Sequence, residues 1–290
     1  MNGARGSQDG ILRRDGRPSS SRRWLLLSPS RAAIPSGFGT IDNDSARRDK
    51  LLAEMQRFRG QIYLEDGAIR ERQLADGRHR ADEDECSWHL LAIDGSDRVC
   101  GCVRHHICPP NTSFSQLSIA RSALAKSGEW GKKLEAAVES ELELARRLDL
   151  PCVEIGGWAL APEIRGTAEG IRMALAMFSV SQELGGSVGM STVTRRHCSA
   201  SILRRIGGRS FEHGGEELPA YSDPQFECVM EFLRFYSWAP NPRYTVWIEA
   251  IREELRAIPV LAGGLKSEAE VPRADVSWPS VVASNATASA

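Results

Sequence analysis

A glutamate and an arginine, eleven residues apart, bracket the stretch of this chain with the clearest potential for chemistry. Glu154 lies near the start of the apolar run CVEIGGWAL (152–160), and Arg165 opens the segment RGTAEG (165–170) that follows it. A carboxylate in a half-buried strand is costly without a partner, and burial raises its pKa toward the range of a useful base. Glu154 is therefore a candidate general base, and a salt-bridged structural glutamate is the alternative.

The segment from Arg165 to Gly170 has the composition of an anion site at the start of a helix. Gly166 and Gly170 let a ligand approach the backbone, and the first N–H groups of a helix have no partner inside it. The positive end of the helix dipole favours a phosphate at the same place. Thr167 can cap the helix and touch a phosphate, although capping alone explains a threonine there.

Two further groups of polar residues invite a chemical interpretation. Arg104 ends an apolar run, where it can bind an acceptor carboxylate with two hydrogen bonds or pair with a structural acid. Residues 100–108 are rich in metal-ligand types but lack the C-x-x-C spacing of structural zinc sites, so we expect no metal. They are Cys100, Cys102, His105, His106 and Cys108. In a regular strand Cys100 and Cys102 would share one face and His105 would point to the other.

The hydrophobic periodicity places these residues in an α/β domain built on one mixed sheet. Ser45 is the expected cap of a first helix, and a hairpin is expected around the turn at 95–97. Alternation along the strand 152–160 would put Glu154, Gly156 and Trp158 on one face. The expected hairpin strands are 88–94 and 98–106, the other strands 152–160, 187–194 and 226–236, and the later helices 130–148, 165–186, 198–206 and 244–258.

The ends of the chain differ from its middle in composition. Residues 1–44 are rich in Arg, Ser and Gly, and residues 263–290 in Ser, Ala, Pro and Val. Neither has the periodicity of a packed element, so we expect a disordered basic leader, one domain over 45–262 and a disordered tail.

Bulk composition excludes several classes of function. The formal net charge of −1 gives no overall field for nucleic acid, and no apolar run reaches the roughly 20 residues that span a bilayer. The apolar run 24–27 is too short for a signal peptide. Seven cysteines form no paired framework, which favours reduced thiols and a cytoplasmic location.

The spacing Arg165-x-x-Ala168-x-Gly170 resembles the acyl-CoA signature Q/R-x-x-G-x-G/A of GNAT acyltransferases, with Ala168 where glycine is usual. The strand before it, the apolar helix after it and a later helix ending at Gly207-Gly208 are also similar to that family. The resemblance covers roughly residues 50–236. It implies a GNAT-like fold, in which a mixed, mostly antiparallel twisted sheet with splayed central strands is flanked by helices.

Within that family, the hairpin ending at Arg104 and the strand with Glu154 and Trp158 are similar to acyl-homoserine-lactone synthases and N-acyl amino acid synthases. The resemblance implies an N-acyltransferase with Glu154 as base and Arg104 on the acceptor, a small amine such as an amino acid. The donor would be acyl-CoA or acyl carrier protein, with no permanently bound cofactor. Its expected binding residues are Trp158, Ala159, Leu160, Arg165, Gly166, Thr167, Ala168, Glu169 and Gly170.

One departure from the family concerns the acid that protonates the leaving thiolate. GNAT acetyltransferases often place a tyrosine on the helix after the second strand, where this chain has Arg204; Tyr221 is another possible acid. A non-catalytic sensor of acyl-CoA or acyl carrier protein, with a structural Glu154, is the alternative function.

Overall fold

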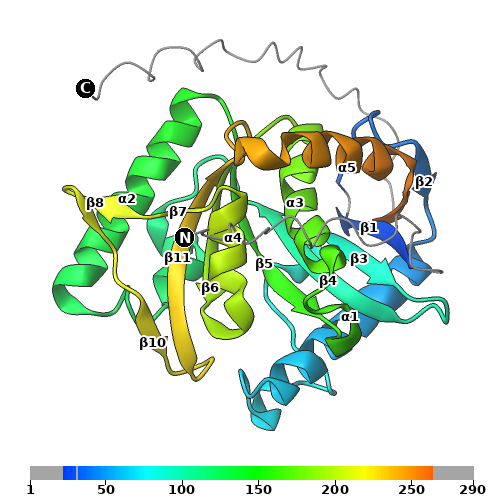
Figure 1. Ribbon diagram of the computed structural model, residues 1–290, viewed down its shortest axis with the longest axis horizontal. Helices are drawn as coiled ribbons and strands as arrows, with labels where there is room; N and C mark the ends of the chain where they lie inside the picture. Colours follow the sequence, from blue (N-terminus) through cyan, green and yellow to red (C-terminus); the bar gives the residue numbers. More distant parts are fainter. Residues whose placement is uncertain (1–21, 31, 264–290) are drawn as a thin grey trace, which may run out of the picture.

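The computed structural model describes residues 22–30 and 32–263, and it has the mixed α/β fold that the sequence predicts (Figure 1). The main sheet has ten strands in the order β10-β11-β6-β5-β4-β3-β1-β12-β2, with β7 paired to β11. Its neighbours are antiparallel except for β5–β6, β1–β12 and β12–β2, which are parallel. A mixed, mostly antiparallel sheet flanked by helices is thereby confirmed.

The strands are β1 (Arg23–Ser30), β2 (Thr40–Asp42), β3 (Trp88–Ile93), β4 (Val99–Ile107), β5 (Cys152–Leu160), β6 (Val188–Thr194), β7 (Arg209–Ser210), β8 (Glu212–His213), β9 (Glu216–Glu217), β10 (Tyr221–Asp223), β11 (Cys228–Tyr236) and β12 (Pro259–Gly263). The α-helices are α1 (Ser45–Glu65), α2 (Gly128–Arg147), α3 (Ala168–Glu183), α4 (Ser199–Ile206) and α5 (Thr245–Ala257). The 3₁₀ turns include η3 (Asp84–Cys86), η5 (Ser118–Arg121), η6 (Pro162–Ile164), η7 (Arg196–Cys198) and η8 (Pro242–Tyr244).

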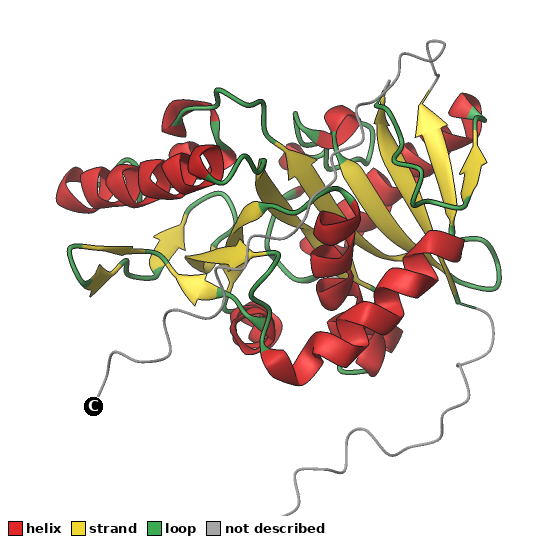
Figure 2. Cartoon of the chain, turned by 90° about the horizontal axis from the view of Figure 1, so that it is seen from above, coloured by secondary structure: helices red, strands yellow, loops and turns green. Residues whose placement is uncertain are grey.

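Helices pack on both faces of the sheet (Figure 2). We call the face covered by α3, α4 and α5 the back and the face that carries α1 and α2 the front. One apolar cluster fills the back, whereas the front has two separate clusters, one under α1 and one under α2. Because α1 and α2 do not share a core, the front of the sheet is open between them.

The expected disordered leader is wrong for residues 23–30 and 40–42, which are strands. β1 lies between β3 and β12, and its side chains from Trp24 to Leu27 are all buried. The run is too short to be recognised alone, and it becomes a strand because partners distant in sequence cover both its edges. β12 extends the fold to Gly263. Of the expected leader and tail, residues 1–21, 31 and 264–290 lie outside the described residues, whereas residues 32–39 form a described loop in which Phe38 is buried.

The expected helices and strands are otherwise confirmed to within a few residues. At the start of α1 the cap is Asp44 rather than Ser45, since the Asp44 carboxylate accepts the Arg47 N–H at 2.9 Å.

A bulge in β5 changes which residues share a face. Cys102 pairs with Ala159 and Arg104 with Gly156, so β5 carries one extra residue between these pairs. Gly157 supplies it with φ of +62°, a conformation that favours glycine. Glu154 and Gly156 therefore face the front, while Trp158 packs against the cluster at the back. The expectation that all three share one face is wrong for Trp158.

A second irregularity separates the cysteines of β4. The register shifts between Ala92 and Ile93 of the partner strand, so Cys100 joins the cluster under α3 and Cys102 the cluster under α1. The expected common face of these two cysteines is therefore wrong. Among the described residues no three His, Cys, Asp or Glu side chains are grouped so that they could hold a metal ion.

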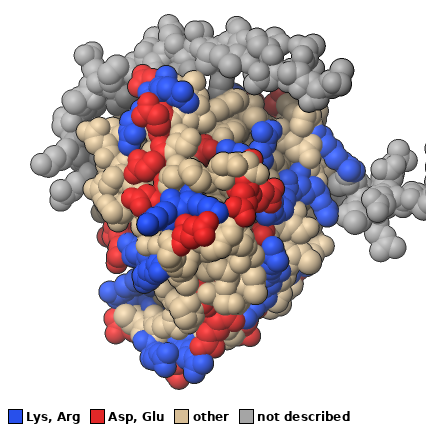
Figure 3. Space-filling model, turned by 90° about the vertical axis from the view of Figure 1, so that its left-hand side faces the viewer, with Lys and Arg blue, Asp and Glu red and all other residues tan. Residues whose placement is uncertain are grey.

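Charge is mixed over the surface that carries α2 and the β8–β9 hairpin. Acidic and basic side chains alternate there without a field of one sign (Figure 3), and Lys133 pairs with both Glu129 and Glu216. Within residues 22–30 and 32–263, no helix combines the length and apolar character needed to cross a bilayer.

Candidate active site

The two central strands β5 and β6 part after three residue pairs. Cys152–Glu154 pair with Val188–Met190, and beyond them β5 continues to Leu160 and β6 to Thr194 without pairing to each other. The facing edges of the two strands border a cavity of ≈ 1470 Å³. It is lined from the front by Glu154 and Met230 and from the back by Leu203, so it passes through the split. The splayed central strands are thus confirmed.

Glu154 stands at the point where the strands part. Its side chain is only 6% exposed and lines the cavity. The Ser118 N–H donates to its two carboxylate oxygens at 2.9 and 3.2 Å, and the Ser118 hydroxyl donates to Oε1. These donors offset the loss of hydration that a buried carboxylate suffers. The partner of Glu154 is thus a serine of η5 and not a cation.

A cluster of charges that the sequence analysis missed lies beside Glu154 on the front. Arg59 of α1 binds Asp84 through both guanidinium ends at 3.0 and 2.6 Å, and both side chains are almost completely buried. Burial alone would raise the pKa of Asp84, but the hydrogen bonds from Arg59 hold it well below its usual range. The run ADEDEC (81–86) is the only sequence signal, and it resembles an ordinary solvated stretch.

Arg104 belongs to the same cluster and is already paired. Its guanidinium lies 3.1 Å from Glu83 and 3.6 Å from Asp84, and Arg121 also binds Glu83 at 2.8 Å. Binding an acceptor carboxylate through Arg104 would therefore require exchange with Glu83. The charged side chains around Glu154 that line the cavity are balanced, with Arg59, Arg104 and Arg121 against Asp82, Glu83 and Glu154. Asp84 is buried behind them and gives the whole cluster an excess of one negative charge. This excess favours a cationic group such as an ammonium.

The loop that begins α3 has free backbone donors. Gly166 has φ of +70°, and Thr167 caps the helix by accepting the Glu169 N–H at 3.2 Å. The N–H groups of Gly166, Ala168 and Gly170 have no acceptor within the described part of the chain. All three residues line the cavity, as a phosphate site requires. The Glu169 side chain points elsewhere, accepting from the Trp24 indole and pairing with Arg172.

Arg165 is clamped by Asp66, the C-terminal cap of α1. The two side chains form a pair of hydrogen bonds at 2.8 and 3.0 Å, and Arg165 Nε donates to the Leu160 carbonyl. Asp66 also contacts His197 Nε2 at 3.2 Å, and its carbonyl accepts from Arg196. Arg165 follows β5 and His197 follows β6. Asp66 therefore connects the ends of these two strands across the place where they are farthest apart in pairing.

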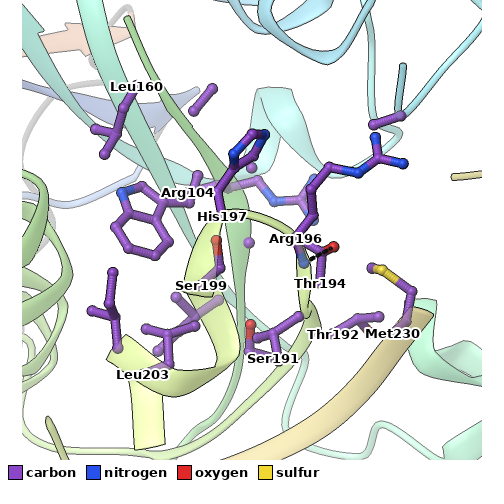
Figure 4. A pocket seen from close by; sticks show the side chains of 18 of the residues that line it. Arg104, Leu160, Ser191, Thr192, Thr194, Arg196, His197, Ser199, Leu203 and Met230 are labelled. Carbon is purple, nitrogen blue, oxygen red and sulfur yellow. Dashed lines mark hydrogen bonds between the residues drawn. The ribbon is translucent and has the colours of Figure 1, made fainter. Parts of the chain in front are cut away.

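The remaining expected donor residues lie at different depths. Ala159 is buried under α1, whereas Leu160 lies next to Gly170 at the rim. Trp158 also lines a smaller apolar cavity of ≈ 40 Å³ at the back, and its indole N–H has no acceptor among the described residues. Figure 4 shows Leu160 and Leu203 on one side of the pocket and Met230 and Thr192 on the other.

The structure separates the two candidates for the acid. Arg204 is held by Glu231 at 3.2 Å and by Ser210 at 2.8 Å and does not line the cavity. Tyr221 of β10 does line it, and burial raises the pKa of its hydroxyl. His79 lines the cavity as well, and burial followed by the charge of Arg59 lowers its pKa to about 4. A neutral imidazole is therefore expected there at pH 7.

No family model matches the sequence, and no curated protein matches it. Several solved structures of acyltransferases have a similar fold. TofI in a ternary complex with an inhibitor and MTA has a TM-score of 0.49 at 12% identity, covering 80% of this chain and 99% of its own. BjaI, a CoA-dependent acyl-homoserine lactone synthase with SAM and isopentyl-CoA, has 0.48 at 13%, covering 86% and 95%.

A third similar structure is FeeM, an N-acyl amino acid synthase from uncultured soil microbes, with a TM-score of 0.43 at 10% identity, covering 75% of this chain and 92% of its own. BjaI and FeeM are of the two kinds that the sequence motifs resemble. At such TM-scores and identities the likeness carries no weight for substrate or activity, which have to be inferred from the residues of this chain.

Proposed function

We propose that this chain is an N-acyltransferase that moves an acyl group from a thioester donor, acyl-CoA or acyl carrier protein, to a small amine. One observation carries the proposal. A single cavity contains a buried carboxylate, Glu154, at its inner end, the unpaired edges of β5 and β6 along its sides, and the free N–H groups of the loop before α3 at its rim.

The donor fits this cavity in one direction. Its phosphate would lie on the N–H groups of Gly166, Ala168 and Gly170, where the dipole of α3 also favours a negative charge. Its extended, amide-containing arm would run along the free edge of β5 beyond Glu154, as an added strand does. The acyl group would then reach Trp158 and the apolar cavity behind it.

The amine would approach from the front, beside the charge cluster around Glu154, which with the buried Asp84 carries one excess negative charge. Its nitrogen attacks the thioester carbonyl carbon, so a C–N bond forms, the C–S bond breaks, and Glu154 accepts the proton of the amine. A backbone N–H of β5 would stabilise the oxyanion of the intermediate. The thiolate takes a proton from solvent or from Tyr221, the one acid candidate that lines the cavity.

Substitution of Glu154 by glutamine tests the proposal. The variant keeps the shape of the side chain and an oxygen that accepts from Ser118, but it cannot take the proton. We expect the release of free thiol from octanoyl-CoA with an amine panel to fall roughly 10²–10⁴-fold, with little change in coenzyme A affinity. The matched control is Glu217→Gln, on an exposed hairpin strand, which should leave the rate unchanged.

Two outcomes would contradict the proposal. A folded Glu154→Gln variant with the rate and pH profile of the unsubstituted protein would remove Glu154 from the reaction. A wild-type protein that binds octanoyl-CoA yet releases no thiol with any amine would be a sensor. Mass spectrometry of lipid extracts from cells that overexpress the chain would identify the acceptor through the new N-acyl product.

A further inference from the structure

The arginines that line the large cavity fall into two groups. Those on β4, α1 and the adjoining loops each have a carboxylate partner, namely Arg59, Arg104, Arg121 and Arg165. Arg196, Arg205 and Arg243 have no carboxylate within 4.0 Å among the described residues. Arg205 of α4 and Arg243 of η8 lie on the back, whereas the guanidinium of Arg196 donates to the carbonyls of Asp66 and Glu227. Uncompensated positive charge on the back rim of the cavity is therefore that of Arg205 and Arg243.

The same rim carries aromatic rings. Tyr244 and Trp247, at the start of α5, line the cavity and are partly exposed while packing against the core at the back. The start of α5 lies directly beside the end of α4 (Figure 1), because the Asn241 side chain donates to the Arg205 carbonyl and its N–H to the Ile206 carbonyl. Arg205 and Arg243 therefore line the same part of the cavity as the two rings.

This region is continuous with the loop that begins α3. Ile171 of α3 and Leu203 of α4 line the cavity between that loop and Trp247, and both are partly buried apolar residues. α4 has eight residues and is about 12 Å long, so Arg196 before it and Arg205 near its end are separated by roughly that distance. A ligand along this groove would meet free backbone N–H groups, an apolar floor, two aromatic rings and unpaired guanidinium groups.

We infer that this groove binds the adenosine 3′,5′-diphosphate end of coenzyme A, so that the donor is an acyl-CoA rather than an acyl carrier protein. The inference rests on the proposed function, in that it assigns the groove to the donor. A single guanidinium group can donate two hydrogen bonds to the oxygens of one phosphate, and a purine stacks on indole or phenol rings. An acyl carrier protein presents a phosphopantetheine arm without a nucleotide and leaves the rings Tyr244 and Trp247 unused.

Binding of a fragment tests the assignment without turnover. By titration calorimetry, adenosine 3′,5′-bisphosphate should bind the full chain at least tenfold more tightly than adenosine 5′-monophosphate, because a second phosphate meets a guanidinium. Arg205→Glu and Arg243→Glu should each weaken the bisphosphate about tenfold or more. The matched control is Arg209→Glu, an exposed arginine of β7 that does not line the cavity.

Trp247→Leu should weaken adenosine 3′,5′-bisphosphate and leave the binding of 4′-phosphopantetheine unchanged, because only the nucleotide meets the ring. The inference is overturned if neither nucleotide binds, if Arg205→Glu and Arg243→Glu bind as tightly as Arg209→Glu, or if 4′-phosphopantetheine competes with octanoyl-CoA as well as coenzyme A does. Tight nucleotide binding without thiol release from octanoyl-CoA and any amine would leave the groove assigned and remove the transferase function.

Discussion

At the scale of single residues, Asp66 has the most unusual set of partners. Its carboxylate binds Arg165 and contacts His197 Nε2, and its carbonyl accepts from Arg196, so it joins three side chains that border the donor loop. A carboxylate in this position resembles a bound anion. Asp66 thus neutralises the charge of Arg165, which a phosphate would otherwise use.

We therefore expect Asp66→Asn to bind coenzyme A several-fold more tightly, because the amide no longer holds Arg165 by charge. Titration calorimetry of coenzyme A measures the affinity, and Asp76→Asn, a change at an exposed turn, is the control. Weaker binding in Asp66→Asn would mean that the clamp shapes the loop and does not compete with the donor.

The sequence predicted part of this site and missed the rest for identifiable reasons. Glu154 and the segment from Arg165 to Gly170 could be recognised because the strand, loop and helix that carry them are contiguous in sequence. The pairing of Arg59 with Asp84 and the clamp on Arg165 could not be found, since their partners lie far apart in the chain and meet only through packing. The roles of these donor and acceptor residues stay predictions.

At the scale of elements, the bulge at Gly157 decides how β5 presents its side chains. A Cβ at this position would lie 3.1 Å from Arg59 Nη1, and the substituted residue would have to keep the backbone φ of +62° that L side chains rarely adopt. We expect Gly157→Ala to lower the free energy of unfolding by about 1–3 kcal/mol, because a strained backbone conformation of this kind costs about that much. Urea denaturation measures the change.

The adjacent glycine offers a matched comparison for that substitution. A Cβ on Gly156 would meet only Arg104 Nη2, at an ordinary 3.7 Å, and its φ is not positive. Gly156→Ala should therefore be almost neutral for stability. Equal losses in the two variants would show that the bulge conformation is not what makes Gly157 necessary.

Elements with strong local periodicity were predicted well, and those that depend on partners were not. The helix before β5, the strand β5 and the helix α3 have apolar spacing that shows their type from sequence alone. β2 and β12 are short, the apolar run of β1 is confined to residues 24–27, and these three strands pair with one another across the sheet. Both bulges escaped prediction because alternation assumes a regular strand, although the pair Gly156-Gly157 was a signal.

At the scale of the whole molecule, buried histidines couple stability to pH. Burial lowers the pKa of His79, His89 and His105 to about 4 each, against about 6.5 in an unfolded chain. Below pH 6.5 the unfolded state binds protons that the folded state does not, so stability falls as the pH falls toward 4. The lowered pKa of Asp84 affects the free energy of unfolding only at lower pH, because an unfolded aspartate titrates near 3.9.

We expect the free energy of unfolding to drop by about 2 kcal/mol per histidine between pH 7 and pH 5. Urea denaturation at both pH values gives the difference. His105→Gln, which can still bond Ser181, should remove about a third of this drop. An unchanged pH dependence in His105→Gln would assign the acid sensitivity to other groups.

The place of β12 between β1 and β2 also bears on how the chain is made. On the ribosome, β1 and β2 emerge early, but the strand that separates and joins them is the last of the described elements to be synthesised. Until Val260 meets Leu26 and Ile41, one edge of β1 remains open beside its buried side chains. Folding of this half of the sheet is therefore completed only when nearly the whole domain has left the exit tunnel, and a nascent chain that stalls before Pro259 exposes an apolar strand edge to any chaperone or neighbour.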